Sequence, residues 1–98
     1  MTGCGAPTNL DGVDVSTQAV ISGVVRRAGA VVAGAYVRLL DASGEFAAEV
    51  PTDGTGQFRF FAAPGTWTVR TLAVGAEPVD RAVVARHGVV AEVEVAVK

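Results

Sequence analysis

The chain has 98 residues, of which 50% are hydrophobic and 18% are charged, and its net charge at neutral pH is -2. A chain of this length forms a single domain, and its apolar half is sufficient to bury a core. Its seven arginines and single lysine are scattered, which argues against nucleic acid or an anionic membrane as a partner.

Residues 1–17 contain few large apolar side chains, so we expect a flexible N-terminal arm. The arm carries Cys4, the only cysteine of the sequence, between two glycines. One cysteine cannot form an internal disulfide, and neither a basic leader nor a bilayer-length apolar run is present. We therefore expect a cytoplasmic protein.

The remaining residues, 18–98, alternate between short runs of β-branched or aromatic residues and breaks made of glycine or proline. This pattern is typical of an all-β sandwich, and no segment keeps a helical period. The breaks leave seven predicted strands, over residues 19–26, 35–40, 46–52, 57–62, 66–74, 79–84 and 89–97.

Alternation along these strands predicts which side chains face the core. The inward set of the last strand is Val89, Ala91, Val93, Val95 and Val97. The same count in other strands gives Ala35, Val37, Leu39, Phe58, Phe60, Trp67 and Val69. We expect Trp67, Phe58 and Phe60 to contribute most to the core, because an aromatic side chain buries about 150–250 Å².

Polar residues between and within the strands allow two further predictions. Arg38, Arg59 and Arg70 would form a stripe on one sheet face if their strands are neighbours. Pairing with glutamates on adjacent strands, Glu49, Glu92 or Glu94, explains these arginines equally well. In the segment TDGTG, Asp53 is expected to cap a hairpin turn, since the segment lacks the carboxylates that calcium requires.

Three stretches of the chain resemble the repeat of carboxypeptidase regulatory-like domains: ISGVV (21–25), AGAYVRLLD (33–41) and TDGTGQFRFFAAPGTWTVR (52–70). The resemblance implies a transthyretin-like (prealbumin-like, Ig-like Greek-key) β-sandwich, here with seven strands. The expected organisation is therefore a flexible arm over residues 1–17 and a carboxypeptidase regulatory-like β-sandwich over residues 18–98.

The Cys-Gly-Ala-Pro start and the segments RLLDASGEF and FRFFAAPGTWTVR are also similar to small bacterial SseC-type proteins. That family has no established function, and its link to sulfur metabolism comes from genes that neighbour thiosulfate sulfurtransferase (rhodanese) genes. The resemblance implies a protein partner, for which a rhodanese-type sulfurtransferase is the candidate. Formation of a homo-oligomer stays open.

Enzymes on similar sandwiches rely on residues that this sequence lacks. Related purine-degradation hydrolases use several histidines, and intradiol dioxygenases bind iron through two tyrosines and two histidines, whereas Tyr36 and His87 stand alone here. No G-x-S-x-G motif accompanies His87, which falls in a predicted turn. The only lysine, Lys98, and the only asparagine, Asn9, cannot crosslink core strands as in pilins. We expect no catalytic activity, metal or cofactor.

Two hypotheses for function follow. The first is a non-catalytic binding or accessory module linked to sulfur metabolism. The second is a sulfur carrier, in which the Cys4 thiol accepts sulfane sulfur from the persulfide of a rhodanese. The thiolate is the reactive form, and no basic side chain within twenty positions of Cys4 favours it. The first hypothesis is therefore preferred.

Overall fold

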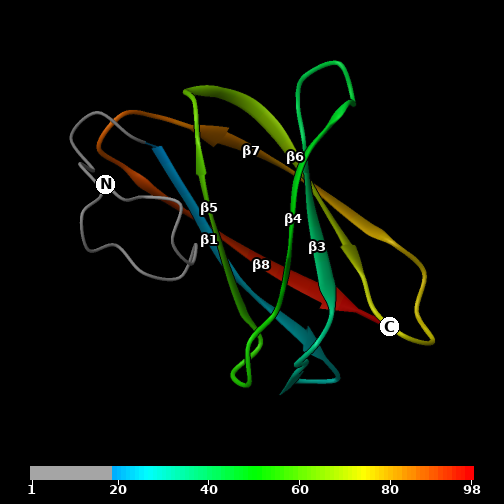
Figure 1. The fold of residues 1–98 in the computed structure, drawn as a ribbon. Coiled ribbons are helices and arrows are strands. Elements are labelled where there is room, and N and C mark those ends of the chain that lie inside the picture. Colours follow the sequence, from blue (N-terminus) through cyan, green and yellow to red (C-terminus); the bar gives the residue numbers. More distant parts are fainter. Residues whose placement is uncertain (1–18) are drawn as a thin grey trace.

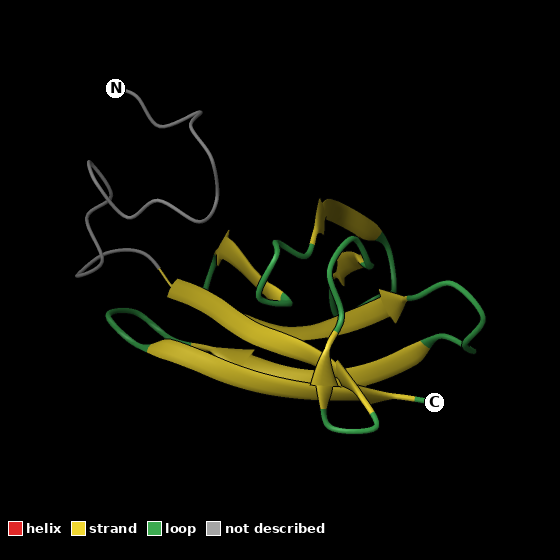
Figure 2. Cartoon of the chain, turned by 90° about the horizontal axis from the view of Figure 1, so that it is seen from below, coloured by secondary structure: helices red, strands yellow, loops and turns green. Residues whose placement is uncertain are grey.

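The computed structural model describes residues 19–98, which form strands and connecting turns only (Figures 1 and 2). The strands are β1 (Ala19–Arg27), β2 (Ala30–Val31), β3 (Tyr36–Leu40), β4 (Phe46–Pro51), β5 (Gln57–Ala62), β6 (Gly65–Leu72), β7 (Val79–Ala85) and β8 (Val90–Val97). The predicted all-β class is confirmed. The arm predicted over residues 1–17, and the boundary at residue 18, lie outside the described residues.

Two sheets form the sandwich. Sheet A contains β5, β1 and β8 side by side, and β2 pairs with the end of β1. Sheet B has the strand order β4-β3-β6-β7. Every pairing is antiparallel except that of β1 with β8, whose arrows point the same way in Figure 1. Two parallel strands cannot be connected by a tight hairpin. Here the parallel pair consists of the first and the last described strands, which are far apart in the sequence.

The structure has eight strands where the sequence predicts seven. The additional strand, β2, has two residues, and its pairing places Arg27 opposite Ala30. Ala28 and Gly29 connect β1 to β2 with φ angles of 51° and 85°. Positive φ at both positions is the geometry of a type I′ turn, which reverses the chain within two residues. The prediction treated Gly29 as a break between the strands over residues 19–26 and 35–40, and it missed the short strand that follows this turn.

The core lies between the two sheets and is built mainly from the residues predicted to face inward. Its most buried members include Phe58, Val37, Val69 and Val95, which were predicted, and also Ile21 and Val25 of β1, which were not. The rings of Phe58 and Phe60 are tilted by 57°, with centroids 6.0 Å apart, a favourable aromatic geometry.

Two members of the predicted core are placed differently. Val89 is 46% exposed, because β8 begins at Val90 and Val89 belongs to the preceding turn. Trp67 packs against the core but is only partly buried, and its Nε1 donates a hydrogen bond to the Ala63 carbonyl at 2.9 Å. Phe58, rather than Trp67, is therefore the aromatic residue that is buried completely.

Gly23 makes the close packing of Phe58 possible. It lies opposite Phe58 on β5 and Val93 on β8, in the middle of β1. A Cβ atom at this position would lie 2.5 Å from the Phe58 ring and would overlap the Val93 carbonyl oxygen. The missing side chain lets the Phe58 ring lie directly against the backbone of β1.

Candidate functional site

The outer face of sheet A presents three rows of side chains across β5, β1 and β8. Strand pairing sets these rows, because successive residues of a strand point to opposite faces. The first row is Phe61, Val20 and Val90; the second is Arg59, Ser22 and Glu92; the third is Gln57, Val24 and Glu94. The face therefore changes from apolar at the start of β1 to charged at its middle.

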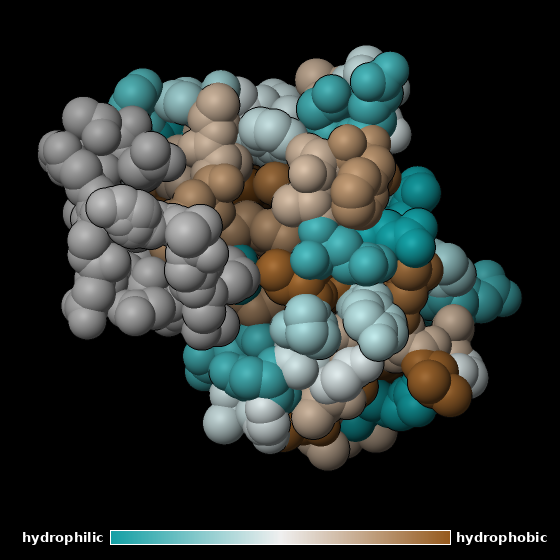
Figure 3. Space-filling model, viewed as in Figure 1, coloured by the Kyte–Doolittle hydropathy of each residue, from teal (hydrophilic) through white to brown (hydrophobic). Residues whose placement is uncertain are grey.

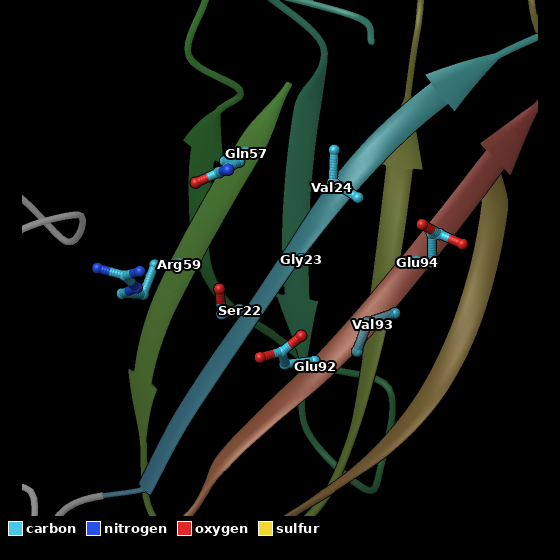
Figure 4. A pocket seen from close by; sticks show the side chains of 8 residues that line it. All are labelled: Ser22, Gly23, Val24, Gln57, Arg59, Glu92, Val93 and Glu94. Atoms are coloured by element: carbon cyan, nitrogen blue, oxygen red, sulfur yellow. The ribbon is translucent and has the colours of Figure 1, made fainter. Parts of the chain in front are cut away.

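A hollow of about 490 Å³ opens on the second and third rows (Figure 4). Its floor is the middle of β1, where Ser22 and Gly23 carry little or no side chain. In Figure 4 Arg59 extends from β5 on one side, while Glu92 lies on β8 on the other. We call this feature the Ser22 hollow. It has a positive side along β5 and a negative side along β8.

The groups that line the Ser22 hollow are suited to recognising a binding partner. Its lining offers the Ser22 hydroxyl, the Gln57 amide, a guanidinium and two carboxylates. One of these carboxylates, Glu94, accepts an ion-pair contact from Arg26 at 3.4 Å, and both side chains remain well exposed. Such groups can make charge-complementary hydrogen bonds to a partner.

The residues considered for catalysis do not join this lining. His87 lies in the exposed turn between β7 and β8. Within residues 19–98, no group of three or more His, Cys, Asp or Glu side chains is arranged to hold a metal ion. Cys4 lies outside the described residues, so its role as a sulfur acceptor stays a prediction.

The outer face of sheet B also carries a row of charged side chains, and these side chains are hydrogen-bonded to one another. In register across the four strands lie Glu49, Arg38, Arg70 and Asp80. Arg38 donates to Glu49 at 2.8 Å, and Arg70 donates two hydrogen bonds to Asp80 at 2.9 and 3.0 Å. The Arg70 guanidinium holds the pKa of the Asp80 carboxyl below its ordinary value. Each arginine of this row thus has a carboxylate beside it.

The predicted stripe of three arginines is wrong. Arg38 and Arg70 do oppose each other on β3 and β6, but Arg59 belongs to β5 in the other sheet. The alternative, pairing across strands, is confirmed for Arg38 with Glu49. Arg70 pairs with Asp80 of β7, an acid that the sequence reading did not consider.

Asp53 caps the β4–β5 turn, as predicted. Its Oδ1 accepts hydrogen bonds from the Thr55 amide and hydroxyl and from the Gln57 amide, at 2.7–3.0 Å. Asp41 holds the β3–β4 turn in the same way. In both cases these bonds, led by the hydroxyl bond, lower the pKa of the carboxyl. The shared pattern Asp-x-Ser/Thr-Gly-x-Phe, at 41–46 and 53–58, was a signal for both turns that we missed.

The edge formed by β4 and β5 is another place where apolar side chains stay partly exposed. These strands diverge from their shared turn in Figure 1, and in the same orientation Figure 3 shows apolar side chains gathered at the centre of the surface. Ala48 and Val50 of β4 pack only partly against the core.

None of the described residues forms a helix long and apolar enough to cross a membrane.

Comparison with known families gives a match over most of the chain. A family model described as "Protein of unknown function (DUF1416)" matches residues 4–97. An uncharacterised protein of Mycolicibacterium smegmatis is 62% identical over 63 residues, which cover 63% of this chain and 70% of that protein. An uncharacterised protein of Mycobacterium tuberculosis is 58% identical over 62 residues, which cover 62% of each chain. The match therefore spans less than two thirds of the second relative.

Solved structures with the same fold are distant in sequence. The major pilin subunit of Bacillus cereus superposes with a TM-score of 0.73 at 18% identity, over 83% of this chain and 29% of the pilin. Chlorocatechol 1,2-dioxygenase from Pseudomonas putida gives a TM-score of 0.62 at 15% identity, over 89% of this chain and 63% of the enzyme. These likenesses confirm the transthyretin-like sandwich and concern the fold alone.

Proposed function

The chain belongs to the DUF1416 family of proteins of unknown function, and we propose that it is a non-catalytic binding module that presents the outer face of sheet A to a protein partner. The proposed partner is a thiosulfate sulfurtransferase, which would make the module an accessory protein of sulfur metabolism. We place this interaction in the cytoplasm. The sulfur link comes from the likeness of the Cys-Gly-Ala-Pro start and the 38–46 and 58–70 segments to SseC-type proteins.

The observation that carries the proposal is the Ser22 hollow. Small residues at the centre of a sheet face let a partner approach the backbone of β1 closely. The charged side chains on the two sides have opposite signs, so they fix the orientation of a partner that carries an acid opposite Arg59 and a base opposite Glu92. The lining is polar enough to stay hydrated when no partner is bound.

The test is to fill the hollow without touching the core. Ser22→Trp adds a large side chain on the outer face of β1, an inner strand of sheet A. Thr68→Trp is the matched control, because Thr68 lies on the outer face of β6, an inner strand of sheet B. The measurement is the chemical-shift change of the labelled full-length protein as purified thiosulfate sulfurtransferase is added.

We expect the shift changes to gather around Ser22, Gln57 and Glu92. Ser22→Trp should weaken binding at least about tenfold, which corresponds to about 1.4 kcal/mol, and Thr68→Trp should leave it unchanged. Changes that map to the outer face of sheet B would contradict the choice of face. No binding of the sulfurtransferase by the unmodified protein would contradict the proposed partner.

The sulfur-carrier alternative makes a separate prediction about Cys4. After incubation with thiosulfate and the sulfurtransferase, the carrier should gain the mass of one sulfur atom on the peptide that contains Cys4, and Cys4→Ser should abolish the gain. A binding module gains no mass and binds equally well with Cys4→Ser. The mass of the unmodified protein therefore separates the two hypotheses, and Cys4→Ser shows whether any gain is on Cys4.

A further inference from the structure

Strand β8 forms an edge of sheet A (Figure 1). It pairs with β1 over eight residues, from Val20 opposite Val90 to Arg27 opposite Val97, without a shift of register. Within residues 19–98 no other strand pairs with β8, although β7 of sheet B lies near it. By contrast β4, an edge of sheet B, has an irregular register and ends in a proline. A regular edge of this length is a template for a further strand.

The backbone groups of β8 alternate between β1 and the open edge. The Val20 amide donates to the carbonyl of Val89, the residue before its register partner, at 3.3 Å. In a parallel ladder the residues on both sides of such a partner are the ones that bond to the neighbouring strand. Odd-numbered residues of β8 therefore direct their amides and carbonyls to β1. The even-numbered residues direct theirs to the open edge, and they include Glu92, Glu94 and Ala96.

Few registers allow two copies of β8 to pair antiparallel through this edge. Directly opposite residues point to the same face of a sheet, so an inward valine must oppose an inward residue. Only registers centred on Val93, Glu94 or Val95 overlap most of the strand with its copy. The register centred on Val93 places Glu92 opposite Glu94 of the second copy, and the one centred on Glu94 places the two copies of this carboxylate together. Both registers oppose like charges, which is destabilising.

The register centred on Val95 opposes unlike charges instead. Lys98 directly follows β8, at an exposed position that continues the outward series of Glu92 and Glu94. In this register Glu92 of each copy lies opposite Lys98 of the other, and Glu94 lies opposite Ala96. The inward valines of the two copies lie opposite one another and extend the apolar inner face of sheet A. Charge and burial therefore favour the same register.

From the open edge, its backbone alternation and this charge pattern we propose that β8 pairs antiparallel with β8 of a second copy, with Val95 on the two-fold axis. The two A sheets then form one continuous sheet. The second copy lies beyond β8, on the side away from β1, so the floor of the Ser22 hollow stays open. The inference goes beyond the proposed binding to a sulfurtransferase, because it concerns two copies of this chain and no third protein.

The first test is amide hydrogen exchange of the full-length protein, measured by NMR over a range of concentrations with a thiol reductant present, while sedimentation reports the mass. We expect the mass to rise to that of two chains, and exchange at Glu92, Glu94 and Ala96 to slow at least about tenfold as it rises. The Val93 and Val95 amides point to β1 and should exchange slowly at every concentration.

Three results of this measurement would overturn the proposal. One is a protein that stays monomeric at the highest concentration that NMR uses. Another is a dimer in which the Glu92, Glu94 and Ala96 amides still exchange rapidly, because the copies then meet elsewhere. The third is slow exchange of these amides at every concentration in a monomer, because the edge is then covered within one chain.

The second test exchanges the charges of the proposed pair. Glu92→Lys alone and Lys98→Glu alone each oppose like charges at two places in the dimer, so each should weaken dimerisation at least about tenfold. The two substitutions combined restore unlike charges and should restore dimerisation. Glu45→Lys makes the same charge change in the exposed β3–β4 turn and is the control, which should leave dimerisation unchanged.

No recovery in the combined variant, or an equal loss with Glu45→Lys, would refute the register centred on Val95. Neither test contains a sulfurtransferase, so failure of that proposed partner would leave both results unaffected.

Discussion

The outer faces of the two sheets use similar residues in different arrangements. On sheet B, each arginine lies one strand away from its carboxylate, and short hydrogen bonds join Arg38 to Glu49 and Arg70 to Asp80. On sheet A, Arg59 and Glu92 share a row but have β1 and the small Ser22 between them, so their Cα atoms are two strand spacings, about 10 Å, apart. Sheet B joins the charges of its row by short hydrogen bonds between adjacent strands, while sheet A places Arg59 and Glu92 on opposite sides of a hollow.

The inner faces of the two sheets differ as well. Phe58 lies against the bare backbone of Gly23 on the inner face of sheet A. Trp67 on sheet B lies at the border of the core and keeps part of its surface in water. A face with little side-chain cover at its centre suits contact with another protein surface, whereas a row of completed ion pairs suits water.

The largest expected effect compares the two aromatic residues. Phe58→Ala should lower the free energy of unfolding by about 3–5 kcal/mol, because it leaves a cavity in the core. Trp67→Ala should cost about 2 kcal/mol, since less of its surface leaves water on folding. Urea denaturation at neutral pH measures both values. Equal costs, or a larger cost at Trp67, would remove the distinction between the two sheets.

The next effect tests the close approach of Phe58 to β1. Gly23→Ala should lower the free energy of unfolding by about 1–3 kcal/mol, because the added Cβ forces the ring and the β8 backbone apart. Gly54→Ala is the control, since a Cβ there meets nothing within 4 Å and its φ is not positive. This control should change stability by less than about 0.5 kcal/mol. A cost at Gly23 as small as that at Gly54 would argue against the tight contact.

A smaller effect, in this case a gain in stability, is expected in the turns. Ala28 has a φ of 51°, which L-residues other than asparagine and aspartate rarely adopt. Ala28→Asn should raise the free energy of unfolding by about 0.5–1 kcal/mol. Ala42→Asn in the β3–β4 turn of sheet B should give no gain, because Ala42 has no positive φ. Thermal unfolding of both variants makes this comparison, and an equal response would mean that φ does not limit the β1–β2 turn.

The smallest effect concerns pH and the charged row of sheet B. Arg70 lowers the pKa of Asp80 below its ordinary value of 3.8, so folding favours the charged carboxylate. The stabilisation is fully present above pH 3.8 and is lost as the pH falls through the lower pKa of the folded state. The stability difference between the unmodified protein and Asp80→Asn should therefore be constant between about pH 5 and 7 and shrink below about pH 4. A difference that grows in acid would contradict this ion pair.

The Ser22 hollow was not predicted, although all of its residues are visible in the sequence. Outward alternation places Ser22, Arg59 and Glu92 on sheet faces, but it does not say which strands are neighbours. Arg59 illustrates the limit. Like Arg38 and Arg70 it occupies an outward position in its strand, but that strand belongs to the other sheet. The pairing of Arg70 with Asp80 depended equally on the position of β7.

The all-β class, nearly all the strands and most of the core could be predicted from the sequence, because alternation and turn residues act over a few positions of the chain. The capped turn at Asp53 could also be predicted, because its hydrogen bonds reach only four residues along the chain. The strand pairing, the parallel arrangement of β8 and β1, and the contact of Gly23 with Phe58 became visible in the folded structure alone. These features depend on contacts between residues far apart in the chain, and the local sequence around each residue does not determine such contacts.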